Sequence, residues 1–178
     1  MEETPAPVAT ARSVGFRYGL IMAAISIAYF LILTFASVDM TSGIGRWSSI
    51  IFYVVVLYLA HKNFKDEGDG FMSYGQGMSI TFWLALVSSV IYSIFFYVYI
   101  KFIDSSFVEA IKNKQIEEMQ NRGMSDEQIN QAMGFAGAFM TPEAMLIFGL
   151  VGGIIFIVVV GLLVSAITQK KNPQGEMV

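Results

Sequence analysis

One histidine and three carboxylates, close together in the sequence, are the groups in this chain best suited to chemistry. They are His61, Asp66, Glu67 and Asp69. Imidazole and carboxylate groups can hold a cation, but this spacing does not match a calcium-binding loop, and the neighbouring glycines are typical of a turn. We therefore expect a solvated turn, and we take this polar cluster as the first place to look for a site.

The rest of the sequence excludes most other chemistry. The chain has no cysteine, so it has no disulfide, thiolate metal site or cysteine nucleophile. It also contains no nucleophile–base pair, zinc motif, Walker loop or dinucleotide fingerprint. The net charge of −3 and the lack of a basic stripe argue against a nucleic-acid partner. We expect a protein that is not an enzyme and that has no cofactor and no metal.

Four uncharged apolar runs are the elements that must position any site. They cover residues 18–38, 47–60, 71–100 and 144–169. A bilayer core of about 30 Å takes roughly 20 apolar residues of helix, and three of the runs reach this length. The second run is short, and it spans only if the helix starts near Ser42 and Arg46 reaches the headgroups beside Trp47. The alternative is a re-entrant segment, which would put the termini on opposite sides of the membrane.

The apolar runs predict an all-α, polytopic membrane protein. The mean hydropathy of +0.60 and the apolar content of 55% agree with that class. We expect four transmembrane helices in a bundle, at about 15–37, 42–60, 77–102 and 142–168. They form a single domain over 14–171, with a disordered tail at 1–13 and a flexible tail at 172–178.

The segment between the third and fourth spans, about 105–140, predicts a helical hairpin outside the membrane. Ser106 with Glu109, and Ser125 with Gln128, have the spacing of capping boxes, and Gly123 suits the end of the first helix. The second helix has an apolar face that must be buried on its partner helix, on the bilayer or on another protein. The face consists of Ile129, Ala132, Met133, Ala136 and Met140.

Small residues recur every four positions in three of the spans, broken only by Ile157 in the fourth. Such rows let helix backbones approach closely where lipid supplies no hydrophobic drive. We favour packing within the chain's own bundle, and a homodimer face is the alternative. The rows are Gly15, Gly19 and Ala23; Thr81, Ala85, Ser89 and Ser93; and Gly149, Gly153, Gly161 and Ser165.

The basic residues near the spans predict the orientation. With four spans, one side of the membrane carries six of them near helix ends, against Arg46 and Lys101 on the other. Because basic residues stay in the cytoplasm, we expect both termini there, in the inner membrane of a bacterium, with the hairpin outside. The six are Arg12, Arg17, Lys62, Lys65, Lys170 and Lys171.

Three stretches carry a resemblance to a known family. They read HKNFKDEGDGFMSYGQG at 61–77, GMSDEQINQAM at 123–133 and LIFGLVGG at 146–153. Over about residues 13–171 the chain resembles a family of small membrane proteins, found mainly in Bacteroidetes, known as domain of unknown function 4199. The resemblance implies a four-span inner-membrane protein, and it assigns no catalytic or binding residue.

These observations favour a non-enzymatic accessory, assembly or envelope protein that acts through protein–protein contacts. Its expected partners are the lipid bilayer, a membrane or envelope protein bound at the 105–140 hairpin, and further copies of the chain. One alternative is a small-solute or ion transporter or channel formed by an oligomer, with hydroxyls such as Ser89, Ser93 and Ser165 facing water. The other is a membrane enzyme that uses the loop from His61 to Asp69.

Overall fold

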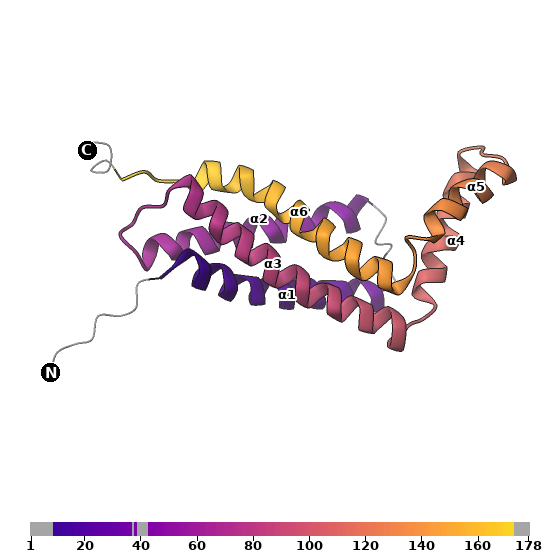
Figure 1. Ribbon diagram of the computed structural model, residues 1–178, viewed down its shortest axis with the longest axis horizontal. Coiled ribbons are helices and arrows are strands. Elements are labelled where there is room, and N and C mark those ends of the chain that lie inside the picture. The colour runs from indigo at the N-terminus through magenta and orange to yellow at the C-terminus, as the bar shows by residue number, and fades with distance from the viewer. Residues whose placement is uncertain (1–8, 37, 39–42, 173–178) are drawn as a thin grey trace. The chain divides into compact units, whose positions relative to one another are not determined.

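The computed structural model describes residues 9–36, 38 and 43–172, and the regular structure in these ranges is helical (Figure 1). A π-helical turn, η1 (Tyr99–Ile103), continues α3. One antiparallel bridge joins Met72 and Lys170. The prediction of an all-α protein is therefore confirmed. The α-helices are α1 (Ala11–Phe35), α2 (Gly43–Asp66), α3 (Tyr74–Val98), α4 (Phe107–Asn121), α5 (Asp126–Gly137) and α6 (Pro142–Thr168).

Three helical segments are long and apolar enough to cross a membrane: Ala11–Phe35, Tyr74–Ile103 and Pro142–Thr168. The chain is therefore an integral membrane protein. Among the described residues, helix α2, with 24 residues, is not one of these three apolar segments. Its crossing of the membrane remains a prediction. The expectation that Arg46 reaches the headgroups beside Trp47 is not tested, because the side chains of these two residues lie outside the described part of the structure.

The chain divides into two compact units, which share α3 and α6. The bundle unit consists of residues 1–91 and 153–178, and the hairpin unit of residues 92–152. In the bundle unit, all four contributing helices supply side chains to one apolar core. This core includes Val14, Met22, Val56, Leu57, Ala60, Ile80, Leu84, Ala85, Ile157 and Val164.

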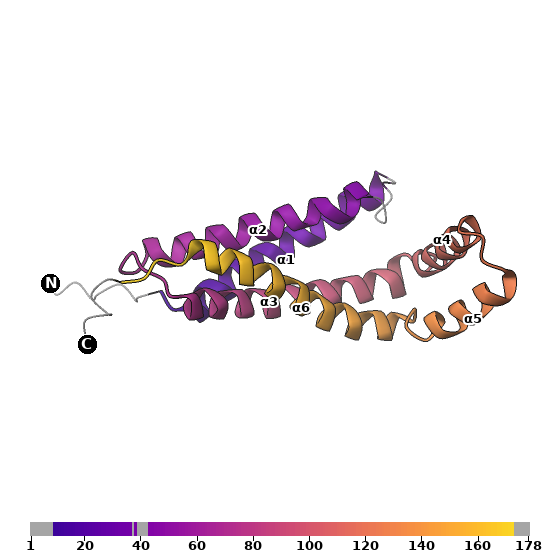
Figure 2. The ribbon, with the colours of Figure 1, turned by 90° about the horizontal axis from the view of Figure 1, so that it is seen from above.

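In the bundle unit α2 turns back along α1 (Figure 2). The rings of Tyr29 and Phe52 lie 5.2 Å apart across these two helices. On another side of α2, Tyr53 meets Phe156 of α6, with ring centroids 5.6 Å apart. Aromatic contacts thus join α2 to both of the apolar helices beside it.

Two helices start earlier than the sequence patterns indicated. Helix α1 begins at Ala11 rather than near residue 15, because Thr10 and Ser13 cap it reciprocally. Helix α3 begins at Tyr74 rather than near Gly77. There the backbone N–H of Ser73 donates to Gln76 at 2.7 Å, and the N–H of Gln76 donates to the Ser73 hydroxyl. These caps outweigh the low helix propensity of the glycines that follow.

In the hairpin unit, one predicted capping box is wrong and the other is confirmed. The Ser106 side chain does not cap α4, because the backbone of Ser106 is already helical, with φ −77° and ψ −17°. Its hydroxyl points to the carboxylate of Asp104, to which it donates at 2.6 Å. Ser125 and Gln128 do form the reciprocal box at the start of α5. Helix α4 ends at Asn121 as expected, and Gly123 takes the left-handed φ of 77° that the turn needs.

Candidate functional site

His61 lies inside the bundle unit and not in a solvated turn. Its side chain is completely buried, because α2 continues as a helix to Asp66. The ring Nδ1 lies 2.8 Å from the hydroxyl of Thr168, and Nε2 lies 3.1 Å from the carbonyl oxygen of Gly77. A carbonyl oxygen can only accept, so Nε2 carries a proton. His61 therefore joins α2 to α3 and α6 through both ring nitrogens.

The three carboxylates of the polar cluster stay exposed. Asp69 accepts a hydrogen bond from the backbone N–H of Phe71, which is a turn contact. Glu67 accepts from Asn63 at 2.9 Å and pairs with Arg17 of α1 at 3.0 Å. The hydrogen bond from Asn63, and then the contact with Arg17, lower the pKa of Glu67. Glu67 therefore links the end of α2 to the start of α1.

The structure thus separates His61 from Asp66, Glu67 and Asp69. The histidine faces the helices, and the carboxylates face outward. Within the described residues, no three His, Asp or Glu side chains gather closely enough to hold a metal ion. The geometry gives His61 a role in packing, and its sequence neighbours do not form a site with it.

Small residues of α6 lie directly against α3, in the order expected for antiparallel helices. A Cβ added to Gly161 would lie 2.7 Å from the hydroxyl of Thr81, and one added to Gly153 would lie 2.9 Å from that of Ser89. One turn further along, Ser165 lies against Gly77, whose Cβ would be 3.0 Å from its hydroxyl. From one pair to the next along α6, the two helices advance by eight and then by four residues in opposite directions. We call this contact the α3–α6 seam.

Helix α1 uses its small residues in the same way against another side of α3. A Cβ on Gly15 would lie 2.6 Å from the Cβ of Trp83, and a Cβ on Gly19 would lie 2.8 Å from that of Val87. Ala23 of the same row is buried as well. The glycines of these rows in the bundle unit are in contact with the chain's own helices.

The α3–α6 seam also accounts for three buried hydroxyls. Thr81, Ser89 and Ser165 are buried and have no hydrogen-bond partner in the described structure. Each of them stands against a glycine of the facing helix. Ser88, in contrast, donates to the carbonyl oxygen of Leu84 at 2.8 Å. The missing Cβ of each glycine leaves room for the facing hydroxyl, so the two helices approach closely although these three hydroxyls make no hydrogen bond in the described structure.

The hairpin unit contains an ionic contact that the sequence patterns did not suggest. Lys101 of η1 donates to Glu143 of α6 at 2.7 Å and to the hydroxyl of Tyr97 at 2.6 Å. The sequence placed Lys101 near the end of the third span but indicated no partner for it. The i, i+4 spacing of Tyr97 and Lys101 could have predicted the contact between these two residues. The contact with Glu143 could not be predicted in this way, because Glu143 lies 42 residues from Lys101 in the sequence.

The apolar face expected on α5 is mostly covered within the molecule. Ile129 and Met140 are buried, and the residues between them on that face are half-buried. A different row is exposed, which we call the phenylalanine strip. The rings of Phe135 and Phe139 lie 5.3 Å apart, and those of Phe139 and Phe148 lie 5.1 Å apart. The i, i+4 spacing of Phe135 and Phe139 is the sequence signal that could have predicted this row.

Comparison with known proteins identifies the family of the chain. No curated protein and no solved structure matches the chain. A family model with the description Protein of unknown function (DUF4199) matches residues 17–170. That range runs from the first turns of α1 to the end of α6 and includes both units. The chain therefore belongs to this family of proteins of unknown function.

Proposed function

We propose that this protein is a non-enzymatic accessory or assembly protein of the bacterial inner membrane, and that it binds a second membrane protein through the phenylalanine strip. The observation that carries the proposal is the exposure of Phe135, whose side chain is 75% exposed on a helix outside the three apolar segments. Aromatic side chains that are left exposed together are typical of interaction surfaces.

The hairpin has little core of its own. No residue of α4 is buried, and Ile129 is the buried residue of α5. Two short helices with so little apolar burial gain little stability from each other. A partner that covers Phe135 and Phe139 would supply the missing burial.

The course of the strip indicates what kind of partner fits. It starts on α5, which is too short and too polar to span a bilayer, and it ends at Phe148 of α6, inside an apolar segment. A soluble protein could reach the first part only. A protein with a membrane-spanning helix and a segment beside it could cover the whole strip.

Two properties of the bundle unit support four spans with cytoplasmic termini. Helix α2 has 24 residues, or about 36 Å of helix, which exceeds the thickness of a bilayer core. The start of α1, the α2–α3 turn and the end of α6 lie together, joined by Arg17 with Glu67 and by Lys65 with the Thr168 carbonyl. All six basic residues of the predicted cytoplasmic side belong to these segments, as the positive-inside rule requires.

Single-cysteine variants test this topology, because the natural chain has no cysteine. Asp66→Cys, Ser125→Cys and Gln169→Cys are treated in intact cells with a thiol reagent that does not cross membranes. We expect labelling at position 125 alone before lysis, and at all three after it. A fourth variant, Ala9→Cys, reports the crossing of α2, because α3 and α6 both cross between positions 66 and 169 and keep these two on one side. Different labelling of positions 9 and 66 before lysis would show that α2 does not cross.

The partner is tested by placing a photo-crosslinking amino acid at Phe135, with the exposed Asn130, on another face of the same helix, as the control position. We expect a crosslinked product with a second membrane protein at 135, weakened by Phe139→Ala, and none at 130. A product with the mass of two copies of the chain would favour the homo-oligomer instead. Equal products at both positions, or no effect of Phe139→Ala, would contradict the proposal.

The transporter alternative has less support. It needs Ser89, Ser93 and Ser165 to face water, whereas all three are buried and the first and last lie against glycines. The enzyme alternative needs His61 to act with the carboxylates beyond it, and their side chains face different ways.

A further inference from the structure

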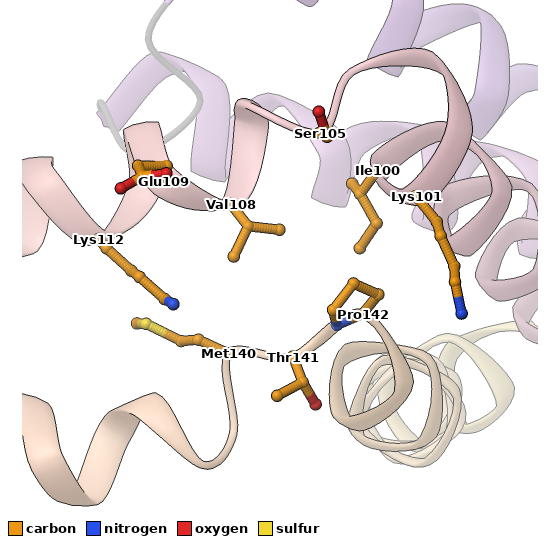
Figure 3. Close-up of a pocket in the computed structure, with 9 residues that line it drawn as sticks. All are labelled: Ile100, Lys101, Ser105, Val108, Glu109, Lys112, Met140, Thr141 and Pro142. Carbon is orange, nitrogen blue, oxygen red and sulfur yellow. The ribbon is translucent and has the colours of Figure 1, made fainter.

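A cavity of about 360 Å³ lies in the hairpin unit between η1, the first turns of α4 and the start of α6. Ile100, Val108 and Pro142 face the space that it encloses, and the ammonium group of Lys112 points toward it (Figure 3). Its volume is at the lower end of the range for small-molecule sites, about 300–1,000 Å³. A group the size of a lipid headgroup therefore fits.

The place of this cavity in the chain fixes its depth in the membrane. Ile100 and Lys101 belong to the end of the apolar segment Tyr74–Ile103, and Pro142 is the first residue of the apolar segment Pro142–Thr168. Where membrane helices end, the surroundings change from acyl chains to headgroups. The cavity thus lies at headgroup level, with Ile100 and Met140 as a buried apolar floor.

Two opposite charges at the cavity have no partner among the described residues. Neither Lys112 nor Glu109 makes an ion pair or side-chain hydrogen bond with the described residues, whereas Lys101 is bonded to Glu143. Glu109 is available because the capping box with Ser106 does not form. Lys112 points inward and Glu109 stands at the outer edge (Figure 3). The site thus offers a positive group and a negative group one helical turn apart.

The backbone adds a preference for an anion. Helices α4 and α6 both begin beside the cavity, at Phe107 and Pro142. The start of a helix carries partial positive charge and favours phosphate. The inner part of the cavity is therefore suited to an anion and the rim, at Glu109, to a cation.

We propose that this cavity binds the headgroup of an aminophospholipid, with the phosphate at Lys112 and the ammonium group at Glu109. The separation of charges matches a zwitterionic headgroup better than an anionic one, because an anionic headgroup would leave Glu109 unpaired. The apolar floor and the depth in the membrane favour the intact lipid over a soluble phosphate compound. This site is independent of the partner proposed for the phenylalanine strip.

The test measures lipids retained by the purified full-length protein, by native mass spectrometry, after equal additions of phosphatidylethanolamine and phosphatidylglycerol. We expect the wild type to retain more phosphatidylethanolamine. Lys112→Ala should lower the retention of both lipids about fivefold or more, the size expected for a charge-assisted hydrogen bond. Lys114→Ala, on the same helix but away from the cavity, should leave retention unchanged.

Glu109→Gln isolates the amine contact. We expect this variant to keep its lipid but to lose the preference between the two headgroups. Val108→Trp fills the cavity without changing charge, and it should lower retention while circular dichroism shows unchanged helix content. A result in which neither Lys112→Ala nor Val108→Trp lowers retention below that of Lys114→Ala would overturn the site.

Two further outcomes would also decide against the proposal. If the wild type retains both lipids equally, or if Glu109→Gln keeps the preference, the headgroup amine is not recognised. If soluble phosphoethanolamine displaces the lipid at equal concentration, the site takes a soluble compound and not a lipid. Failure of displacement, together with the losses expected for Lys112→Ala and Val108→Trp, supports the intact lipid.

Discussion

The bundle unit and the hairpin unit use apolar residues in opposite ways. In the bundle unit, Leu57 and Leu84 are fully buried in a core shared by four helices. In the hairpin unit, α4 buries no residue and Phe135 remains exposed. Packing density sets the cost of changing a side chain, so the bundle unit should tolerate few substitutions. The hairpin unit has apolar surface that its own helices do not cover, and both proposed binding sites lie in this unit.

The largest difference between the units should appear on truncation of a large apolar side chain. Leu84→Ala removes a fully buried side chain, and such truncations lower the free energy of unfolding by about 2–5 kcal/mol. Phe135→Ala removes an exposed ring and should change it by no more than about 0.5 kcal/mol. Thermal or denaturant unfolding in detergent measures both values. Equal losses would show that the hairpin has a core that depends on Phe135.

The next largest effect concerns the α3–α6 seam. Gly161→Leu places a side chain against Thr81, where even a Cβ does not fit, so we expect a loss of about 1–3 kcal/mol or more. Gly152→Leu is the matched control on the same helix, because a Cβ there meets nothing within 4 Å. Unfolding of the two variants in the same detergent compares them. Leucine has a higher helix propensity than glycine, so a loss that is similar in both variants would mean that the close contact with Thr81 does not set the cost.

A third prediction separates the packing role of His61 from the polar cluster. His61→Leu removes both buried hydrogen bonds of the ring, to the Gly77 carbonyl oxygen and to the Thr168 hydroxyl, and we expect a loss of about 1–3 kcal/mol. Lys62→Ala, at the exposed neighbouring position, should be close to neutral. Unfolding experiments measure both. If Asp66→Ala and Asp69→Ala destabilised as much as His61→Leu, the four residues would act together after all.

The smallest effect concerns the exposed contact between α1 and α2. Because Asn63 and Arg17 lower the pKa of Glu67 in the folded protein, its contribution is present above the pKa of the unfolded state. It is lost as the pH falls through the lower, folded pKa. The melting temperature should therefore fall slightly less on acidification in Glu67→Gln than in the wild type. An identical pH dependence would show that the contact does not stabilise the folded state.

The sequence predicted the apolar segments well because hydropathy and length act locally. The segment at 142–168 was predicted with the bounds that α6 has, since Thr141, Pro142 and Glu143 form a strong start signal. The predicted start of α3 was three residues late, because the capping by Ser73 and Gln76 outweighs the low helix propensity of the glycines there. The box at Ser106 did not form, because the backbone of Ser106 is already helical and not extended as an N-cap requires.

The site residues were harder to predict, because their partners are distant in the sequence. His61 and Asp66 look like neighbours along the chain, but α2 carries them to different faces of one helix. The partner of His61 is Thr168, 107 residues away. The small-residue rows were easier, because a four-residue spacing in a helix already defines a face.

By itself, the sequence determined that this is a helical membrane protein with an extra pair of polar helices, because apolar run length and capping signals are local properties. Only the tertiary structure decided what each group faces. It buried His61 against Thr168, set the hydroxyls of the α3–α6 seam against glycines, and left Phe135 exposed. It also brought Lys112 and Glu109 to one cavity. The physical reason is that contacts between helices depend on register and rotation, which local sequence patterns constrain only in part.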